Sequence, residues 1–432
     1  MDIQTLYSLY QQHPVVTTDS RNCPAGSIFI ALKGASFNGN TFAAQALEKG
    51  CAYAVVDEAE YANDPQGRIL LTGNCLRTLQ ELANIHRKTL GTRIIGITGT
   101  NGKTTTKELT AAVLSKKYNL LYTQGNLNNH IGVPLTLLRL RPEHELAIIE
   151  MGASHPGDIA ELTHIAEPDY GLITNVGKAH LEGFGSFEGV IQTKGELYRF
   201  LQKKGNATIF IHHENEYLQQ IAQGLTQIAY GTTEGLYISG KLHTCNPYLS
   251  FDWKRPLDSS FRPVQLQLIG SYNLENALAA IAIGTYFDVA PEQIDEALET
   301  YIPQNNRSQL KDTGRNQLII DAYNANPTSM MAALQNFQQL HSAHKMVILG
   351  DMKELGTDSR TLHQQIADYV TDCQFEKAIL VGEEFQATDT NLPVVPNTES
   401  LIDLLKQKAP KGYHILIKGS NSMHLPKAID FL

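Results

Sequence analysis

The stretch GITGTNGKTTTKE, residues 96–108, combines a strand exit, a glycine-rich turn and a Lys-Thr pair that opens a helix. The apolar, β-branched run 92–98 predicts a buried strand before the turn, and a helix is expected over 103–117 after it. Backbone N–H groups of such a turn, together with those of the helix N-terminus, bind phosphate oxygens. We therefore predict a phosphate loop in which Lys103 meets the β- and γ-phosphates and the Thr104 hydroxyl holds Mg²⁺.

This loop is a variant of the standard nucleotide-binding pattern. G-x-x-x-x-G-K-[ST] places a glycine five residues before Gly102, but that position is Ile97, and glycines stand at 96 and 99 instead. A plain glycine-rich turn with a surface lysine is the alternative interpretation. We favour phosphate binding because strand, turn, Lys-Thr pair and helix follow in the order that it requires. Mg²⁺ also needs carboxylates, and we assign Glu150, at the end of the run 145–150, rather than read it as a solvent-facing strand end.

A β/α alternation extends along most of the chain. Short apolar runs separated by helical stretches predict strands of a parallel sheet that is buried on both faces. They lie at 145–150, 170–174, 207–211, 317–323, 345–351, 377–382 and 414–419.

Other segments have a different pattern. Before residue 91, β-like runs at 27–34 and 52–58 flank a helical stretch at 41–50, and helical spacing of apolar residues covers 75–90. Residues 212–264 are less periodic, and we expect a small antiparallel addition to the sheet there. Further helices are predicted over 272–287 and 291–301, the second with Pro at its first position.

Composition excludes several classes of protein. The 432 residues carry 35 Lys+Arg and 44 Asp+Glu, a net charge of −9, and 42% are hydrophobic, which indicates two to four globular domains rather than a disordered chain. We expect no nucleic-acid partner and no membrane partner, because the chain has no broad basic character and no apolar run of about 18 residues. Five scattered cysteines without a C-x-x-C motif fit a reducing cytoplasm, and we expect no signal peptide and a monomer.

Eight motifs together resemble the Mur ligase family, the ATP-dependent, amide-forming ligases of bacterial cell-wall precursor synthesis. The motifs are GTNGKTT (99–105), NLNNHIGVP (126–134), EMGASHPGDI (150–159), NVGKAHLEGFGS (175–186), TKGEL (193–197), YNLENALAA (272–280), NNRSQ (305–309) and DAYNANPTSM (321–330). The resemblance covers nearly the whole chain and is strongest over about 92–200 and 265–330.

The resemblance implies an α/β fold with three domains. These are an N-terminal α/β domain that binds the UDP-linked substrate (1–90), a central P-loop-type ATPase domain with a mostly parallel sheet (91–304), and a C-terminal Rossmann-like domain that binds the amino substrate (305–432). The motifs at 126–134, 150–159 and 321–327 are typical of the members that join D-alanyl-D-alanine to UDP-N-acetylmuramoyl-tripeptide. In that reaction ATP phosphorylates a carboxylate, and an amine attacks the acyl phosphate, which yields an amide, ADP and phosphate.

The resemblance also implies roles for particular residues. The ATP-binding set would be Gly99, Thr100, Asn101, Gly102, Lys103, Thr104, Thr105, Asn276 on the adenine side, Arg307 at the phosphates and Asp321 at the ribose. The metal set, for two Mg²⁺ ions, would be Thr104, Glu150, His180 and Lys194, with Lys194 carbamylated by CO₂. The residues expected to be catalytic are Lys103, Lys194 and His180. Without the resemblance, His180 would be read as structural and Lys194 as an ordinary helix-surface lysine.

The substrate sites are the least specific part of the resemblance. Ser20 and Arg21, from TTDSR (17–21), would contact the UDP group, although a polar turn explains them nearly as well. The nearby SFNGN (36–40) departs from the family's usual F-D-G-H. Polar residues expected along the muramoyl-peptide channel are Asn126, Asn128, Asn129, Ser154 and His155, which could instead stabilise loops. The segments 350–356 and 417–424 are candidates for the dipeptide pocket.

Two alternative functions remain at this point. One is another ligase of the same architecture, either the diaminopimelate- or lysine-adding ligase or folylpolyglutamate synthase. The first lacks support because no D-N-P-R-type signature occurs in the last third of the chain, and the folate enzyme leaves the UDP-like segment unexplained. The other is a P-loop nucleotide switch, which would need the phosphate loop but not His180, Lys194, Arg307 or Asp321.

Overall fold

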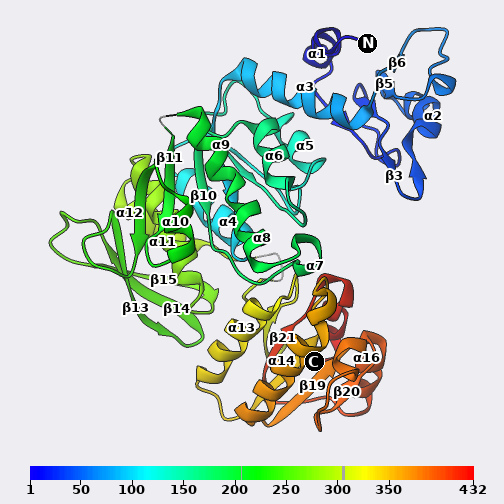
Figure 1. Cartoon of the computed structure of the whole chain (residues 1–432). Helices are drawn as coiled ribbons and strands as arrows, with labels where there is room; N and C mark the ends of the chain where they lie inside the picture. The colour runs from blue at the N-terminus through cyan, green and yellow to red at the C-terminus, as the bar shows by residue number, and fades with distance from the viewer. Residues whose placement is uncertain (206, 304–306) are drawn as a thin grey trace.

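A computed structural model describes residues 1–205, 207–303 and 307–432, which form three principal sheets flanked by helices (Figure 1). The N-terminal segment projects at one end, the central segment contains the largest sheet, and the C-terminal segment packs below it in the view of Figure 1. The predicted α/β class is confirmed.

The central sheet has nine strands in the order β15-β14-β13-β12-β11-β10-β7-β9-β8. Its parallel strands are β7 (Arg93–Thr98), β8 (Leu120–Tyr122), β9 (Leu146–Glu150), β10 (Tyr170–Ile173), β11 (Thr208–His212) and β12 (Thr226–Gly231). The antiparallel extension consists of β13 (Ile238–Cys245), β14 (Tyr248–Lys254) and β15 (Arg262–Ile269). The antiparallel addition expected within 212–264 is therefore present, although β12 in that stretch pairs in parallel with both of its neighbours.

Helices cover both faces of this sheet because successive strand side chains point to opposite sides. In β7, Ile94 belongs to one buried cluster and Ile95 to another, and Ile149 and Ile148 of β9 divide in the same way. The first cluster packs against α5 (Gly132–Leu137), α6 (Asp158–Ala166) and α9 (Glu196–Lys204). The second packs against α4 (Lys103–Leu114), α11 (Asn273–Tyr286) and α12 (Pro291–Thr300). Short helices α7 (Leu181–Phe184), α8 (Phe187–Lys194) and α10 (Glu216–Ile221) complete the segment.

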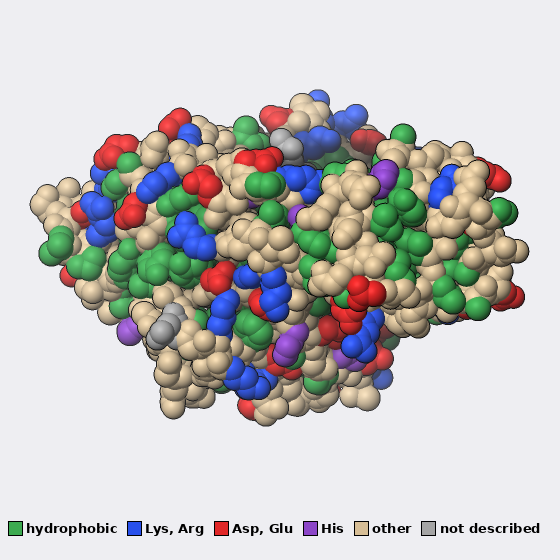
Figure 2. Space-filling view, turned by 90° about the horizontal axis from the view of Figure 1, so that it is seen from above, with side chains coloured by type: hydrophobic (Ala, Val, Ile, Leu, Met, Phe, Trp, Pro, Cys, Tyr) green, Lys and Arg blue, Asp and Glu red, His purple; other side chains and the backbone are tan. Residues whose placement is uncertain are grey.

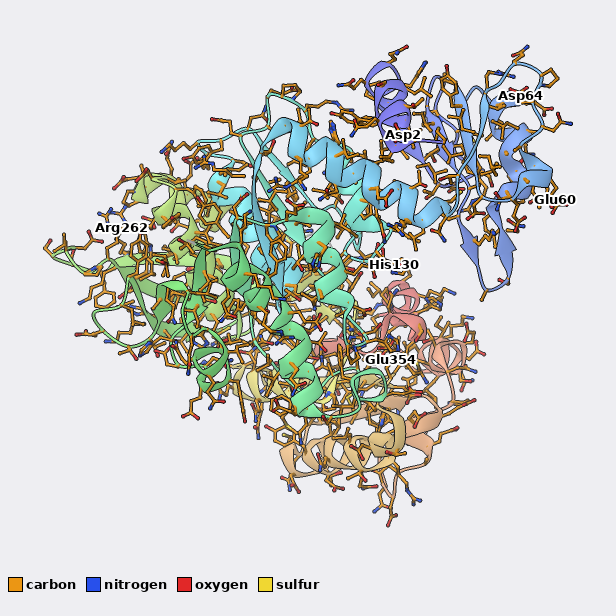
Figure 3. All side chains as sticks on the ribbon, turned by 45° about the horizontal axis from the view of Figure 1, so that its top comes forward. Asp2, Glu60, Asp64, His130, Arg262 and Glu354 are labelled. Carbon is orange, nitrogen blue, oxygen red and sulfur yellow. The ribbon has the colours of Figure 1, made fainter. Side chains whose placement is uncertain are left out.

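The N-terminal segment is built on a parallel four-stranded sheet of order β1-β2-β5-β6. Its elements are α1 (Ile3–Gln12), β1 (Val16–Thr17), β2 (Ile28–Ile30), the hairpin β3 (Lys33–Gly34) and β4 (Phe37–Asn38), α2 (Ala43–Glu48), β5 (Tyr53–Val56), β6 (Ile69–Leu71) and α3 (Cys75–Leu90). The single strand expected over 27–34 is thus divided into β2 and β3. Glu60 and Asp64 mark the outer end of this segment, far from Glu354 of the C-terminal segment (Figure 3).

The C-terminal segment repeats the β/α pattern in a six-stranded sheet of order β16-β17-β21-β18-β19-β20. Its strands are β16 (Gln309–Asp312), β17 (Gln317–Asp321), β18 (Lys345–Gly350), β19 (Lys377–Val381), β20 (Val394–Val395) and β21 (His414–Lys418), and its helices are α13 (Pro327–Gln339), α14 (Ser359–Cys373), α15 (Glu383–Gln386) and α16 (Thr398–Gln407). The four predicted strands are present. The short edge strands β16, which is antiparallel to β17, and β20 were not predicted.

Most predicted helices agree with the structure to within a few residues. Helix α3 spans the predicted 75–90, whereas α4 ends at Leu114, three residues before the predicted end. The domain limits 1–90, 91–304 and 305–432 stay predictions, and the boundary at 304–305 lies outside the described residues.

Three further features concern the charges at the surface, the hydropathy of the helices and the state of the cysteines. On the face seen in Figure 2, acidic and basic side chains are interspersed rather than gathered by sign. Among the described residues, no helix combines the length and hydropathy needed to cross a bilayer. The five cysteines are free thiols.

Helix α3 joins the N-terminal segment to the central one through the buried Arg87. Its Nε donates to the carbonyl oxygen of Ala166 at 2.7 Å, and its Nη2 donates to that of Glu167 at 2.6 Å and lies 3.3 Å from Asp169 Oδ2. Loss of this side chain would leave buried carbonyl groups without donors, which is costly.

We expect Arg87→Met to lower the free energy of unfolding by about 2–4 kcal/mol, measured as a lower urea midpoint by circular dichroism. Arg77→Met is the matched control on the same helix, because Arg77 is exposed and pairs only with Glu81, so its effect should stay within about 0.5 kcal/mol. Equal midpoints for the two variants would refute the role of Arg87.

Candidate active site

A cleft of about 1080 Å³ lies between the central and C-terminal segments. The carboxyl ends of parallel strands supply most of its polar lining, as expected for an open α/β sheet. Fifteen of the predicted site residues line it: Thr100, Asn101, Gly102, Lys103, Thr104, Thr105, Asn128, Asn129, Glu150, Ser154, His155, His180, Asn276, Arg307 and Asp321. Gly99, Lys194, Asn126, Ser20 and Arg21 are not among the lining residues.

The phosphate loop connects β7 to α4, and its glycines are required by close contacts. Gly99 has φ +142°, and a Cβ there would come within 2.0 Å of Thr174 Oγ1. Gly102 has φ +79°, and a Cβ there would lie 2.4 Å from Asn276 Oδ1. The glycine spacing that departs from the standard pattern therefore fits the neighbouring side chains of Thr174, which follows β10, and Asn276 of α11.

The loop is held from the side of β10. Thr100 N donates to the carbonyl oxygen of Asn175 at 2.9 Å, and Asn101 N donates to Asn175 Oδ1 at 3.0 Å. Thr174 Oγ1 donates to the Asn101 carbonyl at 2.6 Å. These bonds fix the loop before any ligand arrives and leave the first N–H groups of α4 directed at the cleft, where a helix N-terminus attracts anions.

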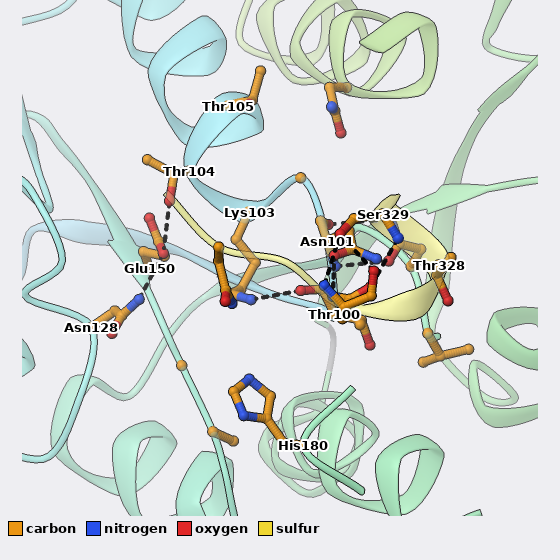
Figure 4. A pocket seen from close by; sticks show the side chains of 18 of the residues that line it. Thr100, Asn101, Lys103, Thr104, Thr105, Asn128, Glu150, His180, Thr328 and Ser329 are labelled. Atoms are coloured by element: carbon orange, nitrogen blue, oxygen red, sulfur yellow. Dashed lines mark hydrogen bonds between the residues drawn. The ribbon is translucent and has the colours of Figure 1, made fainter. Parts of the chain in front are cut away.

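Lys103 is the central cation of the site (Figure 4). Its Nζ donates to the carbonyl oxygens of Gly99 at 2.8 Å and Thr100 at 3.0 Å. Burial lowers the pKa of Lys103 to about 8, an effect that Glu150 opposes and Arg307 increases. An anion in the cleft would stabilise the charged form of this amine.

Glu150 ends β9 and is 1% exposed. Its Oε1 accepts hydrogen bonds from Thr104 Oγ1 at 3.1 Å and Asn128 Nδ2 at 2.8 Å (Figure 4). Its Oε2 has no hydrogen-bond partner among the described residues. A buried carboxylate oxygen left unpaired beside a threonine hydroxyl fits a hard cation such as Mg²⁺, so the residues present suit the metal predicted here.

A second buried lysine, which the sequence analysis did not single out, lies behind this carboxylate. Lys107 Nζ donates to the Thr123 carbonyl at 2.5 Å and lies 3.0 Å from Glu108 Oε1 and 3.8 Å from Glu150 Oε2. Lys107 is the second of two lysines in KTTTKE, residues 103–108. Nothing in that short stretch distinguishes a buried lysine from an exposed one, so its burial could not be predicted.

His180 lines the cleft just before α7, and Lys194 is buried at the end of α8 without lining the cleft. His180 has a left-handed backbone, and its Nδ1 contacts Glu354 Oε2 of the C-terminal segment. Burial lowers the pKa of His180, which Glu354 opposes. Lys194 is 2% exposed, its Nζ donates to the Ala153 carbonyl at 3.4 Å, and burial together with Lys103 brings its pKa well below the usual value.

Within residues 1–205, 207–303 and 307–432, no group of three or more His, Cys, Asp or Glu side chains is placed to hold a metal ion. The predicted metal set contains only two side chains of those types, Glu150 and His180. It is completed by the Thr104 hydroxyl and by Lys194, which becomes a metal ligand only when modified.

The C-terminal segment contributes three charged groups to the cleft. The Arg307 guanidinium stacks 3.8 Å above the Tyr323 ring, and its buried Nε has no hydrogen-bond partner among the described residues. Asp321, at the end of β17, accepts a 2.5 Å bond from Lys418 Nζ at the end of β21. Lys418 was predicted only as part of the 417–424 segment. Its position at the end of a parallel strand is the sequence feature from which its place in the cleft could have been predicted.

One direct hydrogen bond joins the phosphate loop to the C-terminal segment. Asn326 Nδ2 donates to Asn101 Oδ1 at 2.7 Å. Asn326 is also the N-cap of α13, where its side chain and that of Ser329 form a capping box. Thr328 and Ser329 therefore face the loop from the opposite side to Glu150 (Figure 4).

Asn276, expected on the adenine side, lies behind the phosphate loop. Its Oδ1 accepts a bond from Thr106 Oγ1 at 3.0 Å, and its Nδ2 donates to Asn273 Oδ1 at 2.8 Å. The side chain thus supports Gly102 and α4 in the structure, and a contact with adenine stays a prediction.

The residues predicted for the UDP-linked substrate fall into two groups. Ser154 and His155 line the cleft, and their backbone N–H groups both donate to Asp158 Oδ2 at 2.8 Å. Asn129 also lines it, although its Oδ1 accepts bonds from the N–H groups of residues 131 and 132. Ser20 and Arg21 lie in the loop between β1 and β2, well outside this cleft, with Arg21 exposed beside Asp19.

The unusual SFNGN segment has a structural explanation. Asn40 is buried, donates to Asn38 Oδ1 and Asp57 Oδ1 at 2.9 Å each, and accepts a bond from Asp57 N. Asn38 in turn donates to Glu58 Oε2 at 2.8 Å. The two asparagines that replace the usual Asp and His therefore tie their loop to the end of β5.

The two loops proposed for the dipeptide are in contact. Lys353 N donates to Ser420 Oγ at 3.0 Å, and Ser420 N donates to the Asp351 carbonyl at 3.1 Å.

The sequence analysis missed several lining residues, of which His212, Glu214 and Glu275 form one group at the far end of the cleft.

Comparison with known proteins identifies the family to which this chain is related. The family model described as Mur ligase middle domain matches residues 97–284, the Mur ligase glutamate ligase domain matches 306–421, and the Mur ligase family catalytic domain matches 14–87. A relative from Bacillus subtilis (strain 168), UDP-N-acetylmuramoyl-tripeptide–D-alanyl-D-alanine ligase, is 36% identical and covers 96% of this chain and 92% of its own.

Two solved structures are similar over nearly the whole chain. A crystal structure of MurF from Acinetobacter baumannii has a TM-score of 0.86 at 29% identity, covering 98% of this chain and 97% of its own. MurF ligase from Thermotoga maritima in complex with ADP has a TM-score of 0.85 at 25% identity, covering 96% of each chain. From these matches and the shared architecture, the chain belongs to the Mur ligase family.

Proposed function

We propose that this enzyme joins D-alanyl-D-alanine to UDP-N-acetylmuramoyl-tripeptide with hydrolysis of ATP to ADP and phosphate. The product is the UDP-linked pentapeptide, the last intermediate of peptidoglycan peptide assembly before the membrane. The observation that carries this proposal is one cleft shared by two segments, in which the phosphate loop and Glu150 face Arg307, Asp321 and Lys418. Relatives with that activity align along the whole chain.

The cleft is suited to a phosphoryl transfer between two anions. Lys103, Arg307 and the N-terminus of α4 supply positive potential where the γ-phosphate would meet the substrate carboxylate. The amine of the dipeptide then attacks the acyl phosphate carbon, phosphate leaves, and the ammonium proton passes to a base or water. An acyl phosphate hydrolyses readily, so exclusion of water from the cleft during the reaction would protect it.

We assign Mg²⁺ to the surroundings of Thr104 and Glu150, and a second ion to Glu150, His180 and Lys194. Bound there, Mg²⁺ would neutralise charge on the phosphates and on the incoming carboxylate. The Oε2 of Glu150, which accepts no hydrogen bond within the described chain, supports this assignment. Lys107 balances the carboxylate from behind at 3.8 Å.

We further propose that CO₂ carbamylates Lys194. No carboxylate of the described chain lies within 4.0 Å of its Nζ, although the side chain is almost completely buried. Because its pKa is lowered by burial, this amine loses its proton more readily than a surface lysine and is the better nucleophile. Carbamylation would convert it into the carboxylate-like ligand that the metal site otherwise lacks.

The substrates are proposed to reach this cleft from two sides. The UDP group would bind the N-terminal segment near Ser20 and Arg21, and the muramoyl peptide would extend past Asn126, Asn129, Ser154 and His155. D-alanyl-D-alanine would bind beside the loops 350–356 and 417–424, on the C-terminal segment. We also propose that the enzyme acts as a cytoplasmic monomer, which fits its free thiols.

The direct test is phosphate release with Mg·ATP and UDP-N-acetylmuramoyl-tripeptide, with and without D-alanyl-D-alanine. Release that needs both, with a pentapeptide product by mass spectrometry, is expected. Phosphate release that does not depend on the dipeptide would point to another ligase of this family. Phosphate release that depends on neither substrate would favour a nucleotide switch.

Lys194→Ala should lower kcat/KM by about 10²-fold or more, because it removes the proposed carbamate ligand of the second Mg²⁺. Carbon-13 NMR with labelled bicarbonate should detect a carbamate in the unsubstituted enzyme and none in the variant. Lys203→Ala, at an exposed lysine of α9, is the control and should keep both the activity and the signal. Full activity of Lys194→Ala would exclude the proposed role.

Arg307→Ala should lower kcat/KM for ATP by about 10²-fold through loss of a cation at the phosphates. Its melting temperature should change little, since Arg307 makes no ion pair within the described chain and only stacks on Tyr323. Arg315→Ala, an exposed arginine of the same segment, is the control. An unchanged kcat/KM in Arg307→Ala would count against a phosphate contact.

A further inference from the structure

Helix α13 begins against the phosphate loop. Asn326, its N-cap, is 6% exposed, and its Nδ2 donates to Asn101 Oδ1 at 2.7 Å across 225 positions of the chain. Gly177, whose N donates to Thr100 Oγ1, lies on the same side, and a Cβ on Gly177 would come within 3.3 Å of Thr328 Oγ1 in the first turn of α13. The start of this helix is therefore in contact with both the loop and the segment that supports it.

The neighbouring bonds determine how the amide of Asn326 is oriented. Its Oδ1 accepts a hydrogen bond from Ser329 N at 2.9 Å, and a backbone N–H group can only donate. The amide nitrogen therefore faces Asn101. Asn101 is held in turn from β10, since its N donates to Asn175 Oδ1 and its carbonyl accepts from Thr174 Oγ1. Its side chain is thus presented to the C-terminal segment from a fixed backbone.

Capping of α13 does not explain the second bond of Asn326. An N-cap side chain needs only an acceptor for the N–H groups of the first turn, and Ser, Thr and Asp supply one as well as Asn does. The Oδ1 of Asn326 fills that role, and Ser329 completes the capping box. Among the usual N-cap residues, Asn alone carries both an acceptor and a separate amide donor. The donor is the part of this side chain that the helix does not use.

The loop that ends at Asn326 carries groups expected at the nucleotide. It connects β17 to α13 and begins just after Asp321. Tyr323, within this loop, stacks on the Arg307 guanidinium at 3.8 Å. Attachment of the end of the loop to Asn101 therefore sets where Asp321 and Arg307 lie relative to the phosphate loop.

The far end of α13 is attached to the central segment by other contacts. Asn336 Oδ1 accepts from Ser271 N at 3.2 Å, and His341 N, just after the helix, donates to Asn246 Oδ1 at 3.2 Å. Over the described parts of the chain, no further hydrogen bond runs from residues 99–105 to the C-terminal segment. Loss of the Asn326 donor should therefore release the start of the helix while its end stays attached.

We propose that Asn326 is a positioning residue for ATP turnover, whose hydrogen bond to Asn101 holds the loop 321–326 against the phosphate loop and so brings Arg307 and Asp321 to the nucleotide. This proposal rests on the proposed function, in which the cleft binds ATP. Asn326 acts through Asn101 rather than on the reacting atoms. Its loss should therefore weaken nucleotide binding without abolishing the reaction.

The test removes the amide donor and keeps the helix cap. Asn326→Ser retains an acceptor for Ser329 N but has no amide to reach Asn101. Asn397→Ser is the matched control, because Asn397 caps α16 of the same segment through a bond from Ser400 N of the same 2.9 Å and lies outside the cleft. Both variants should melt close to the temperature of the unsubstituted enzyme.

Asn326→Ser should raise the Kd for ADP about fivefold by calorimetry, the loss expected for one hydrogen bond. The KM for ATP should rise by a similar factor, while kcat changes by less than about twofold. Amide hydrogen exchange over residues 99–105, measured without nucleotide, should be faster than in the unsubstituted enzyme, and Asn397→Ser should change none of these quantities. In an Asn101→Ala background, Asn326→Ser should add little, because its partner is already gone.

Unchanged ADP binding and unchanged exchange in a folded Asn326→Ser enzyme would overturn the proposal, as would equal changes in Asn397→Ser, which would indicate an effect of capping alone. Should Asn326→Ser fail to fold, Asn326→Asp keeps the cap acceptor and the side-chain length, and unchanged exchange of residues 99–105 in that variant would overturn the proposal. Failure of the proposed function is distinguishable, because it would appear as ATP turnover that does not depend on the tripeptide and dipeptide. The exchange of the phosphate loop is measured without any substrate.

Discussion

The phosphate loop can hold its shape only because Gly99 and Gly102 carry no side chains. Thr174 and Asn276 occupy the space that a Cβ at either glycine would need, at 2.0 and 2.4 Å. The same contacts bind the loop to β10 and α11, and Asn101 extends them to Asn326 of the C-terminal segment. The geometry of the loop, the start of α11 and the position of the C-terminal segment are thus coupled through a few hydrogen bonds.

The charge around this cleft differs in sign from the net charge of the whole chain. The chain as a whole carries a net charge of −9, yet Lys107, Lys194 and Lys418 are buried around the cleft and Lys103 is half-buried in it. Buried cations are costly unless anions compensate them, and Glu150 and Asp321 compensate only some of this charge. An excess of positive charge would favour the binding of ATP and of a UDP-linked carboxylate, because both substrates are anions.

The sequence predicted those parts of the fold and site that depend on local pattern. Strands β7, β9, β10 and β11 of the central sheet and β17, β18, β19 and β21 of the C-terminal sheet are continuous apolar runs, and α3 shows helical spacing from Cys75 to Leu90, so they were placed nearly correctly. The short strand β8 was not predicted. Lys103 and Thr104 were recognisable because the phosphate loop is contiguous, and Glu150 because it ends a strand. His180, Lys194, Arg307 and Asp321 were found only through the family resemblance, since each comes from a different part of the chain.

What the sequence could not predict depends on contacts between distant residues. The burial of Lys107 requires the position of Thr123 and Glu150, and the pairing of His212 with Glu275 requires β11 to lie beside α11. The short edge strands β16 and β20 have too few residues for a pattern to emerge. Asn40 was read as a departure from a substrate motif, whereas its partners Asn38 and Asp57 give it a role in the fold of its own loop.

The account's central claim is that a single cleft between the central and C-terminal segments binds the nucleotide. A crystal structure with Mg²⁺ and a non-hydrolysable ATP analogue tests it most directly. We expect the phosphates on residues 99–105 with Lys103 and Arg307 against them, the ribose near Asp321, and the base on the side of Asn276. A base on the side of Asn128 and Ser154, or a nucleotide bound without contact to the C-terminal segment, would contradict it.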